Sequence, residues 1–199
     1  IDWIGNLAQQ GYLSGQLLLP MPGMTDPRFE NSVIFICSHS AEGAMGLVIN
    51  TPCENIDFPE LLDQLNIDYG HNITPKAQLK NIPLHEGGPV ETGRGFILHS
   101  ADYAQETTLI ISETIALTAT LDILSAIACG KGPLYYLIAL GFSGWGRGQL
   151  ENEIVRNSWL TIEADAELVF KTDLELKLSR AHAKLGINFS MLSSQFGNA

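Results

Sequence analysis

The spacing of hydrophobic and polar positions changes several times along this chain, and each change predicts a different element. Residues 32–40, SVIFICSHS, alternate in the way that is typical of a strand with two different faces. One face would carry Val33, Phe35, Cys37 and His39. The runs at 13–19 and 45–50 also predict strands, and the turn at 42–43 predicts that 45–50 pairs back antiparallel.

Apolar residues also recur at helical spacing. Asp57, followed by Glu60, forms the pattern of a capping box and predicts a helix. Its core face would carry Phe58, Leu61, Leu62 and Leu65. The segment 117–128 predicts a second helix that Gly130 ends, and 174–185 predicts a third that Gly186 ends. The first ten residues predict a short helix with Trp3, Ile4 and Leu7 on one side.

These elements together indicate the fold class. Short apolar runs at 82–85, 95–99 and 107–112 predict further strands. Strands dominate the first half in hairpin-like runs, and helices are interspersed rather than strictly alternating. The pattern therefore favours an α+β fold with a mixed sheet over a doubly wound parallel sheet. A chain of 199 residues predicts a single domain, 1–199.

The segment 130–162 predicts a strand, a glycine turn at 141–148, a helix from about Gln149 and a second strand. A glycine loop before a helix is the context of phosphate binding. Here Arg147 stands in place of the phosphate lysine and Gly148 in place of the hydroxyl that would hold magnesium, which disfavours nucleotide hydrolysis. Trp145 occupies the second glycine position of a nucleophile elbow, so Ser143 is interpreted as a helix cap.

Charge and cysteine content restrict the kinds of partner and the cellular compartment that the sequence predicts. The formal net charge is −11, and Lys177, Arg180 and Lys184 are too sparse for a basic stripe and are interpreted as a solvated helix face. Direct nucleic-acid binding is therefore disfavoured. Three cysteines without metal-ligand spacing fit a reducing compartment. No window approaches a membrane span and no leader pattern is present, so we expect a cytoplasmic protein.

Several segments, in this order, resemble the YqgE/AlgH family of bacterial proteins. They are LLLPMPGMTDPRFENSVIFICSHSAEGAMGLVINTP (17–52), EGGPVETGRGFILHS (86–100), ALGFSGWGRGQLENEIVRNSWL (139–160) and LGINFSMLSS (185–194). The resemblance covers nearly the whole chain, and it implies a compact fold in which a mixed, largely antiparallel sheet curls toward a partial barrel with several flanking helices.

The resemblance implies little chemistry, because the family has no established enzymatic activity or cofactor. It implies regulation, because one branch of the family, AlgH, is associated with control of alginate synthesis and is described as a transcriptional regulator. The family commonly ends in Gly-His-Ala, whereas this chain has Asn198 at the histidine position, which puts any role of that histidine in doubt.

Two sets of residues are candidate sites. Cys37 and His39 would share a strand face, where a nearby imidazolium can lower the pKa of a thiol. A zinc site that adds His85 or His99 is disfavoured, because parallel side chains chelate poorly. The second set would be a recognition surface or, equally, a polar network that packs a helix. Its members are Trp145, Arg147, Gln149, Asn152 and Arg156. Glu151 and Glu153 are interpreted as a solvated face.

Three functions remain open. The leading hypothesis is a binding or regulatory module rather than an enzyme, and its partner would be a protein or a small ligand. The second is a thiol-based redox sensor that uses Cys37. The third is a hydrolase or transferase that uses Ser143, His99 or a nearby carboxylate. The glycine- and proline-rich loops at 20–29 and 86–95 either carry function or only permit tight turns.

Overall fold

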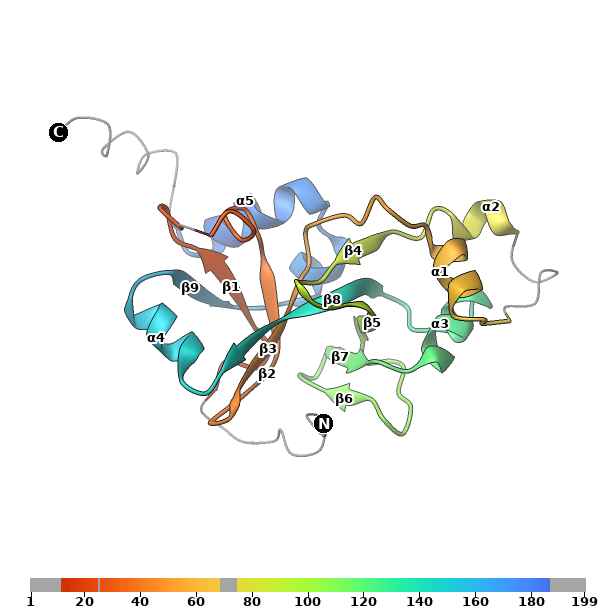
Figure 1. Ribbon diagram of the computed structural model, residues 1–199, viewed down its shortest axis with the longest axis horizontal. Coiled ribbons are helices and arrows are strands. Elements are labelled where there is room, and N and C mark those ends of the chain that lie inside the picture. The colour runs from red at the N-terminus through yellow and green to blue at the C-terminus, as the bar shows by residue number, and fades with distance from the viewer. Residues whose placement is uncertain (1–11, 25, 69–74, 187–199) are drawn as a thin grey trace.

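The computed structural model describes residues 12–24, 26–68 and 75–186, so the helix expected in the first ten residues and Asn198 lie outside the described residues (Figure 1). The strands are β1 (Gln16–Pro20), β2 (Ile34–Ser40), β3 (Gly43–Val48), β4 (Leu84–Glu86), β5 (Val90–Ser100), β6 (Leu109–Ile110), β7 (Ile115–Thr118), β8 (Tyr136–Gly146) and β9 (Trp159–Glu163). The helices are α1 (Phe58–Gln64), α2 (Lys76–Leu79), α3 (Leu121–Ala128), α4 (Gln149–Val155), the π-helix η1 (Glu167–Lys171) and α5 (Leu174–Lys184).

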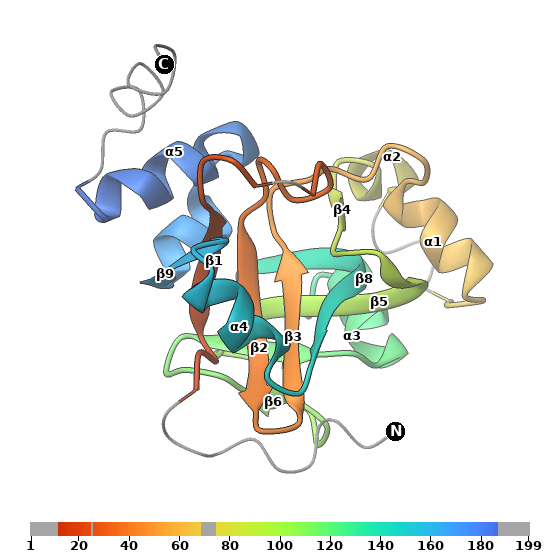
Figure 2. The same cartoon turned by 60° about the vertical axis from the view of Figure 1, so that its left-hand side comes forward.

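Within the described residues the strands form one nine-stranded sheet in the order β6-β7-β5-β8-β3-β2-β1-β9. All pairs along this path are antiparallel, and β4 adds to β8 in parallel. Strand β8 belongs to both halves of the sheet. Figure 2 shows it bending from alignment with β5 to alignment with β3. The sheet thus curls into a half-barrel with flanking helices, which confirms the expected α+β class.

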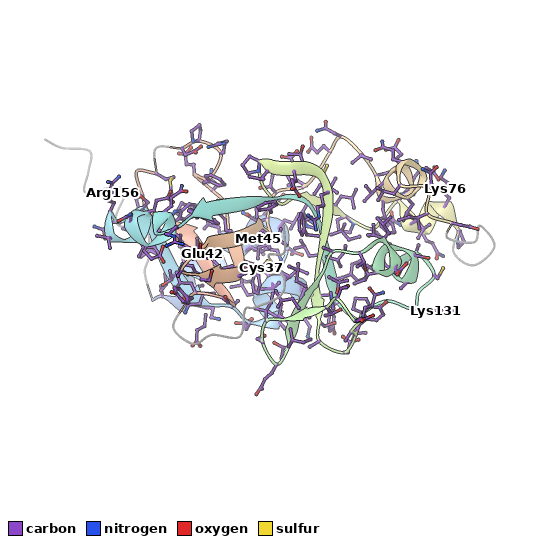
Figure 3. The ribbon with its side chains drawn as sticks, turned by 60° about the horizontal axis from the view of Figure 1, so that its bottom comes forward. Cys37, Glu42, Met45, Lys76, Lys131 and Arg156 are labelled. Atoms are coloured by element: carbon purple, nitrogen blue, oxygen red, sulfur yellow. The ribbon has the colours of Figure 1, made fainter. Side chains whose placement is uncertain are left out.

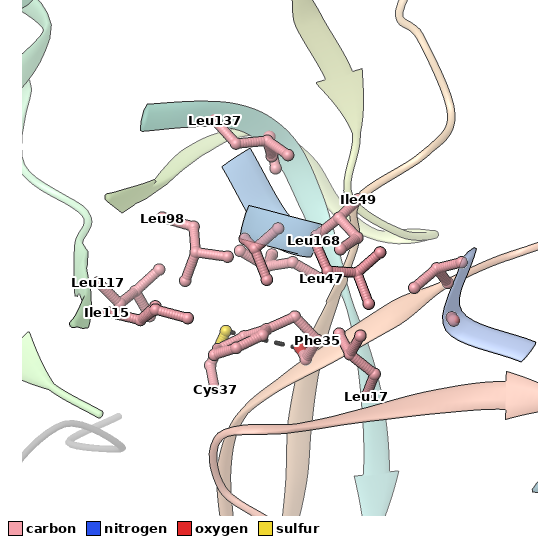
Figure 4. Close-up of a cluster of buried hydrophobic side chains, with 14 of the residues drawn as sticks. Leu17, Phe35, Cys37, Leu47, Ile49, Leu98, Ile115, Leu117, Leu137 and Leu168 are labelled. Carbon is pink, nitrogen blue, oxygen red and sulfur yellow. Dashed lines mark hydrogen bonds between the residues drawn. The ribbon is translucent and has the colours of Figure 1, made fainter. Parts of the chain in front are cut away.

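Three hydrophobic clusters hold this arrangement together. The first lies between the two halves of the sheet, where Phe35 and Leu47 meet Leu98 and Leu117, and Leu168 of η1 joins them (Figure 4). The second packs α1, α2 and α3 on the outer face of β5 and β8. The third packs α4 on the outer face of β1, β2 and β3. Because both faces of the sheet are covered, β2 is buried along almost its whole length rather than on one face.

The glycine turn and the cap predicted at 141–148 are wrong. Residues through Gly146 continue β8, and Ser143 pairs with Gly46 in the middle of the sheet, where its side chain is buried. Gly148 is the N-cap of α4 and takes a left-handed conformation with φ 69°. The sequence pattern missed this part of the strand because its glycines resemble a turn, whereas Gly141 instead permits close contact with the backbone of the 86–95 loop.

The helix predictions are mostly confirmed. Asp57 and Glu60 form the capping box of α1 in both directions, at 2.9 Å for each bond. Gly130 and Gly186 follow α3 and α5, each at φ 67°. The second helix, however, begins at Leu121, and Leu117 lies instead on β7, because its apolar side chain fits the helical period by coincidence.

The solvated face expected on the last helix is wrong at one position. Lys177 is 2% exposed, and its ammonium donates to the carbonyl oxygens of Leu168, at 3.4 Å, and Val169. These carbonyls belong to η1, whose last turn leaves oxygens without helical partners. Lys177 therefore caps the π-helix and fixes α5 against it.

Candidate binding site

The described residues form a pocket of about 500 Å³ between the two halves of the sheet. Its walls come from β2, β3 and β5–β8, and its apolar lining includes Cys37, Met45, Phe96, Leu109, Leu117 and Phe142. Figure 3 shows Cys37 and Met45 lying close together near the middle of the molecule. Pockets of this size with mostly apolar walls are typical of small-molecule sites.

A wide bulge in β5 shapes one wall of this pocket. Val90 pairs with Phe142 and Gly95 pairs with Leu140, so residues 91–94 form an arch opposite the single residue Gly141 of β8. The base of the arch is held by contact between backbones. A Cβ on Gly141, which has φ 73°, would lie 2.5 Å from the carbonyl oxygen of Gly88. The glycines of the 86–95 loop and of β8 therefore position the pocket wall.

The charged groups of the pocket lie on this arch. Nη1 of Arg94 donates to a carboxylate oxygen of Glu91 at 3.2 Å, and both side chains are about half exposed. The Arg94 guanidinium also lies over the Phe96 ring, 5.1 Å from its centroid, and Phe96 meets the ring of Phe142 edge to face at 5.6 Å. Arg94 thus lies against the aromatic wall of the pocket.

Cys37 and His39 do not share a face, so that prediction is wrong. The pairing of β2 with β3 shifts between Ile36 and Ser38, which makes Cys37 the extra residue of a bulge and reverses the alternation after it. Cys37 lines the pocket, whereas His39 pairs with Ala44, which belongs to the cluster under α4. Burial raises the pKa of the Cys37 thiol, which opposes thiolate formation at neutral pH.

His39 instead connects β2 to helix α4. Its Nε2 lies 3.0 Å from a carboxylate oxygen of Glu151, and its Nδ1 accepts from the backbone of Leu13 at 3.2 Å. The Tyr12 ring meets the imidazole edge to face at 4.8 Å. Every one of these contacts packs β2 against its neighbours. His39 therefore has a structural role, and its imidazole faces away from the Cys37 thiol.

The predicted recognition surface separates into a buried and an exposed part. Trp145 is 5% exposed on β8, and its indole donates to Glu153 at 2.9 Å, while the indole of Trp159 donates to the same carboxylate oxygen at 2.8 Å. Gln149 donates to the other oxygen of Glu153. The solvated interpretation of Glu153 is therefore wrong, because this carboxylate joins α4 to two strands.

The rest of that set lies on the outside of the molecule. Arg147 is exposed and pairs with both carboxylate oxygens of Glu42 at 2.6 Å. Gln149, Asn152 and Arg156 are exposed on or beside α4, and Figure 3 shows Arg156 at the end of the molecule away from Cys37 and Met45. These residues remain available for contact with a partner, without Trp145.

The structure does not bring together the residues of the hydrolase or transferase hypothesis or those of the zinc site. Both ring nitrogens of His99 are engaged, by the carbonyl of Ser100 at 2.9 Å and by the hydroxyl of Thr118 at 2.8 Å, and not by Ser143. Burial lowers the pKa of His85 to about 4, so its ring is neutral. Across residues 12–24, 26–68 and 75–186, no group of three His, Cys, Asp or Glu side chains could hold a metal ion.

The two loops that the sequence singled out do meet. Arg28 and Phe29 of the first loop face Gly88, Pro89 and Thr92 of the second across a second pocket of about 480 Å³. The 86–95 loop thus lines both pockets, because its residues Val90 and Arg94 face the apolar pocket described above. The apolar pocket itself was missed by sequence reasoning. The sequence feature that could have indicated the pocket is the pair of glycines that flank Arg94 in EGGPVETGRG.

The fold and the pocket define an α+β half-barrel protein with a largely apolar pocket between the two halves of its sheet. No helix of the described part of the chain is long and apolar enough to cross a membrane. The sequence profile of the family described as AlgH-like matches residues 17–190. The chain therefore belongs to the YqgE/AlgH family, as its motifs indicated.

Individual relatives support this assignment. The chain is 52% identical to a UPF0301 protein of Bradyrhizobium diazoefficiens, over 95% of this chain and 89% of that protein. It is 50% identical to a UPF0301 protein of Rhodospirillum rubrum, over 96% of both chains. The solution structure of the AlgH protein from Pseudomonas aeruginosa matches with a TM-score of 0.77 and 41% identity, over 98% of this chain and 100% of that one.

Proposed function

We propose that this protein is a binding module that takes a small, largely apolar molecule into the pocket between the two halves of its sheet. The pocket is the observation that supports this function. Its volume of about 500 Å³ falls in the range of small-molecule sites, and its walls are aromatic, aliphatic and sulfur-containing. A bulge that reshapes one strand, with its glycines at the points of contact, is a common device beside binding sites.

The proposal includes a regulatory role in the cytoplasm. Family membership favours regulation, and a chain with three cysteines that lack metal-ligand spacing fits a reducing compartment. The exposed residues Arg147, Gln149, Asn152 and Arg156 offer polar and charged groups to a protein partner. Because Trp145 lies between the pocket and α4, ligand binding has a direct route to that surface.

A neutral fluorescent probe tests the binding function. N-phenyl-1-naphthylamine is apolar, and its emission rises when it leaves water. We expect saturable binding to the wild type and a loss of at least about tenfold in affinity in Ala119→Phe, because Ala119 lines the pocket and a phenyl group would fill it. The matched control is Ala183→Phe on the exposed side of α5, which should bind as the wild type does.

Thermal melts of both variants accompany the titration, so that loss of binding is separated from loss of fold. The absence of saturable binding to the wild type, or equal binding by Ala119→Phe with an intact fold, would exclude the pocket as the binding site.

A further inference from the structure

Among the described residues that line the apolar pocket, Arg94 is the one basic side chain. We infer that the ligand is an amphiphilic carboxylic acid, whose apolar body fills the pocket and whose carboxylate displaces Glu91 from Arg94. This inference rests on the proposed function and names the class of molecule that the same site would take. Four observations on the bulge of β5 carry it.

The first observation is the unused capacity of Arg94. A guanidinium carries five N–H donors in a planar fork, and the contact with Glu91 uses one nitrogen at 3.2 Å. A carboxylate can engage two parallel donors of this fork at shorter distance. The single bond to Glu91 is therefore a weaker arrangement than the one that an incoming acid could make.

The second observation is the position of the guanidinium. It lies 5.1 Å from the centre of the Phe96 ring, and both residues line the pocket. Stacking on an aromatic wall orients the fork along that wall. An acid group that binds there has its apolar chain directed along Phe96 and Phe142 toward Met45 and Leu117, which form the apolar part of the lining.

The third observation is the conformation of Glu91. It takes φ 47°, a left-handed conformation that is uncommon outside glycine and that carries strain. A Cβ at Gly93 or at Gly95 would meet nothing within 4 Å, so there is open space beside both glycines near Arg94. Glu91 therefore holds a place that it can leave when a ligand carboxylate replaces it.

The fourth observation is the exposure of the Arg94–Glu91 pair. Both side chains are about half exposed, at 51% and 50%, and pairs of this kind contribute little to stability. Displacing Glu91 is therefore easy. A cationic head would face Arg94 itself, and a neutral head would leave the existing pair in place without a charge-assisted bond of its own. Charge complementarity thus selects an acid over an amine or an alcohol.

Displacement of N-phenyl-1-naphthylamine by three molecules of equal chain length tests this ligand class. The competitors are decanoate, decanol and decyltrimethylammonium, with the two ionic molecules used below their micelle-forming concentrations and decanol below its solubility limit. For the wild type we expect decanoate to compete about tenfold or more better than either of the others. In Arg94→Gln that preference should disappear while the probe still binds. In Glu91→Gln decanoate should bind several-fold more tightly, because the side chain at position 91 no longer carries the charge that competes for Arg94.

The outcomes separate the two proposals. Equal competition by all three molecules, or an unchanged preference for decanoate in Arg94→Gln, overturns the acid and leaves the apolar binding site intact. Failure of the probe itself to bind overturns the proposed function. Flotation with vesicles that contain anionic phospholipid should be negative, and flotation that depends on Arg94 would assign the site to a lipid surface rather than to a free acid.

Discussion

Single polar side chains add to the apolar packing that holds the helices of this protein against their neighbours. The Glu153 carboxylate accepts from the indoles of Trp145 and Trp159 and from Gln149, so one residue of α4 satisfies polar groups on β8 and β9. Lys177 does the same for the carbonyls of η1. The sequence alone does not show the hydrogen-bond partners of these residues. It therefore predicts that they face solvent, since Glu and Lys are rarely buried unless they are paired.

The burial of Lys177 predicts a rise in stability at alkaline pH. Burial lowers the pKa of this ammonium from 10.5 to about 8. Below pH 8 the folded and unfolded chains both hold the proton, and between pH 8 and 10.5 the unfolded chain holds more of it. The contribution of Lys177 to the free energy of unfolding should therefore increase with pH across that window, by up to roughly 3 kcal/mol.

Urea unfolding from pH 7 to pH 10 measures this contribution as a difference between wild type and Lys177→Met, which should lack the increase. Lys184→Met is the matched control, because Lys184 lies on the same helix with an exposed side chain and should keep the wild-type slope. An identical pH dependence in wild type and Lys177→Met would show that Lys177 does not titrate in this range.

At the scale of elements, the sequence predicts what is local. Asp57 and Glu60 determine the start of α1 by their own hydrogen bonds, and Gly130 and Gly186 follow helices because they accept positive φ. The bulge at Cys37 could not be predicted in this way. It depends on the register between β2 and β3, and one extra residue there places His39 on the opposite face.

Sequence reasoning missed the pocket for a related reason. Its walls come from strands that lie far apart in the chain, and the arch around Arg94 is visible only when Val90 and Gly95 are both paired with β8. The family resemblance correctly predicted the curled sheet. The helical spacing of Leu117 led to a wrong prediction, because four apolar positions can match a helix by chance. Non-local pairing is thus the information that a periodic pattern lacks.

Close contact between β8 and the 86–95 loop predicts unequal effects of two alanine substitutions. Gly141→Ala places a Cβ 2.5 Å from a backbone oxygen at φ 73°, and we expect it to lower the free energy of unfolding by about 3 kcal/mol or more. Gly93→Ala, where a Cβ meets nothing within 4 Å, should change it by less than about 1 kcal/mol. Chemical denaturation of both variants checks this, and equal stability would contradict the close packing.

At the scale of the whole molecule, net charge sets the expected response to DNA. The chain carries −11, and Arg28, Arg94, Arg147 and Lys184 are paired with carboxylates in the folded protein. Few cations remain for phosphates. We expect no sequence-specific duplex affinity tighter than about micromolar at physiological salt, measured by fluorescence anisotropy with genomic fragments. A nanomolar complex that weakens steeply with salt would contradict this prediction and favour direct transcriptional control.

The order of strands in the sheet has a consequence for the chain while it is being synthesised. Strands β1, β2 and β3 leave the ribosome first, yet β3 needs β8 and β1 needs β9 as outer neighbours. Until residues 136–163 have been translated, this three-stranded unit carries two open edges and an apolar surface on both faces. We therefore expect nascent chains of this protein to be prone to aggregation until the last strands arrive, and chaperone binding to the first half would protect them during this stage.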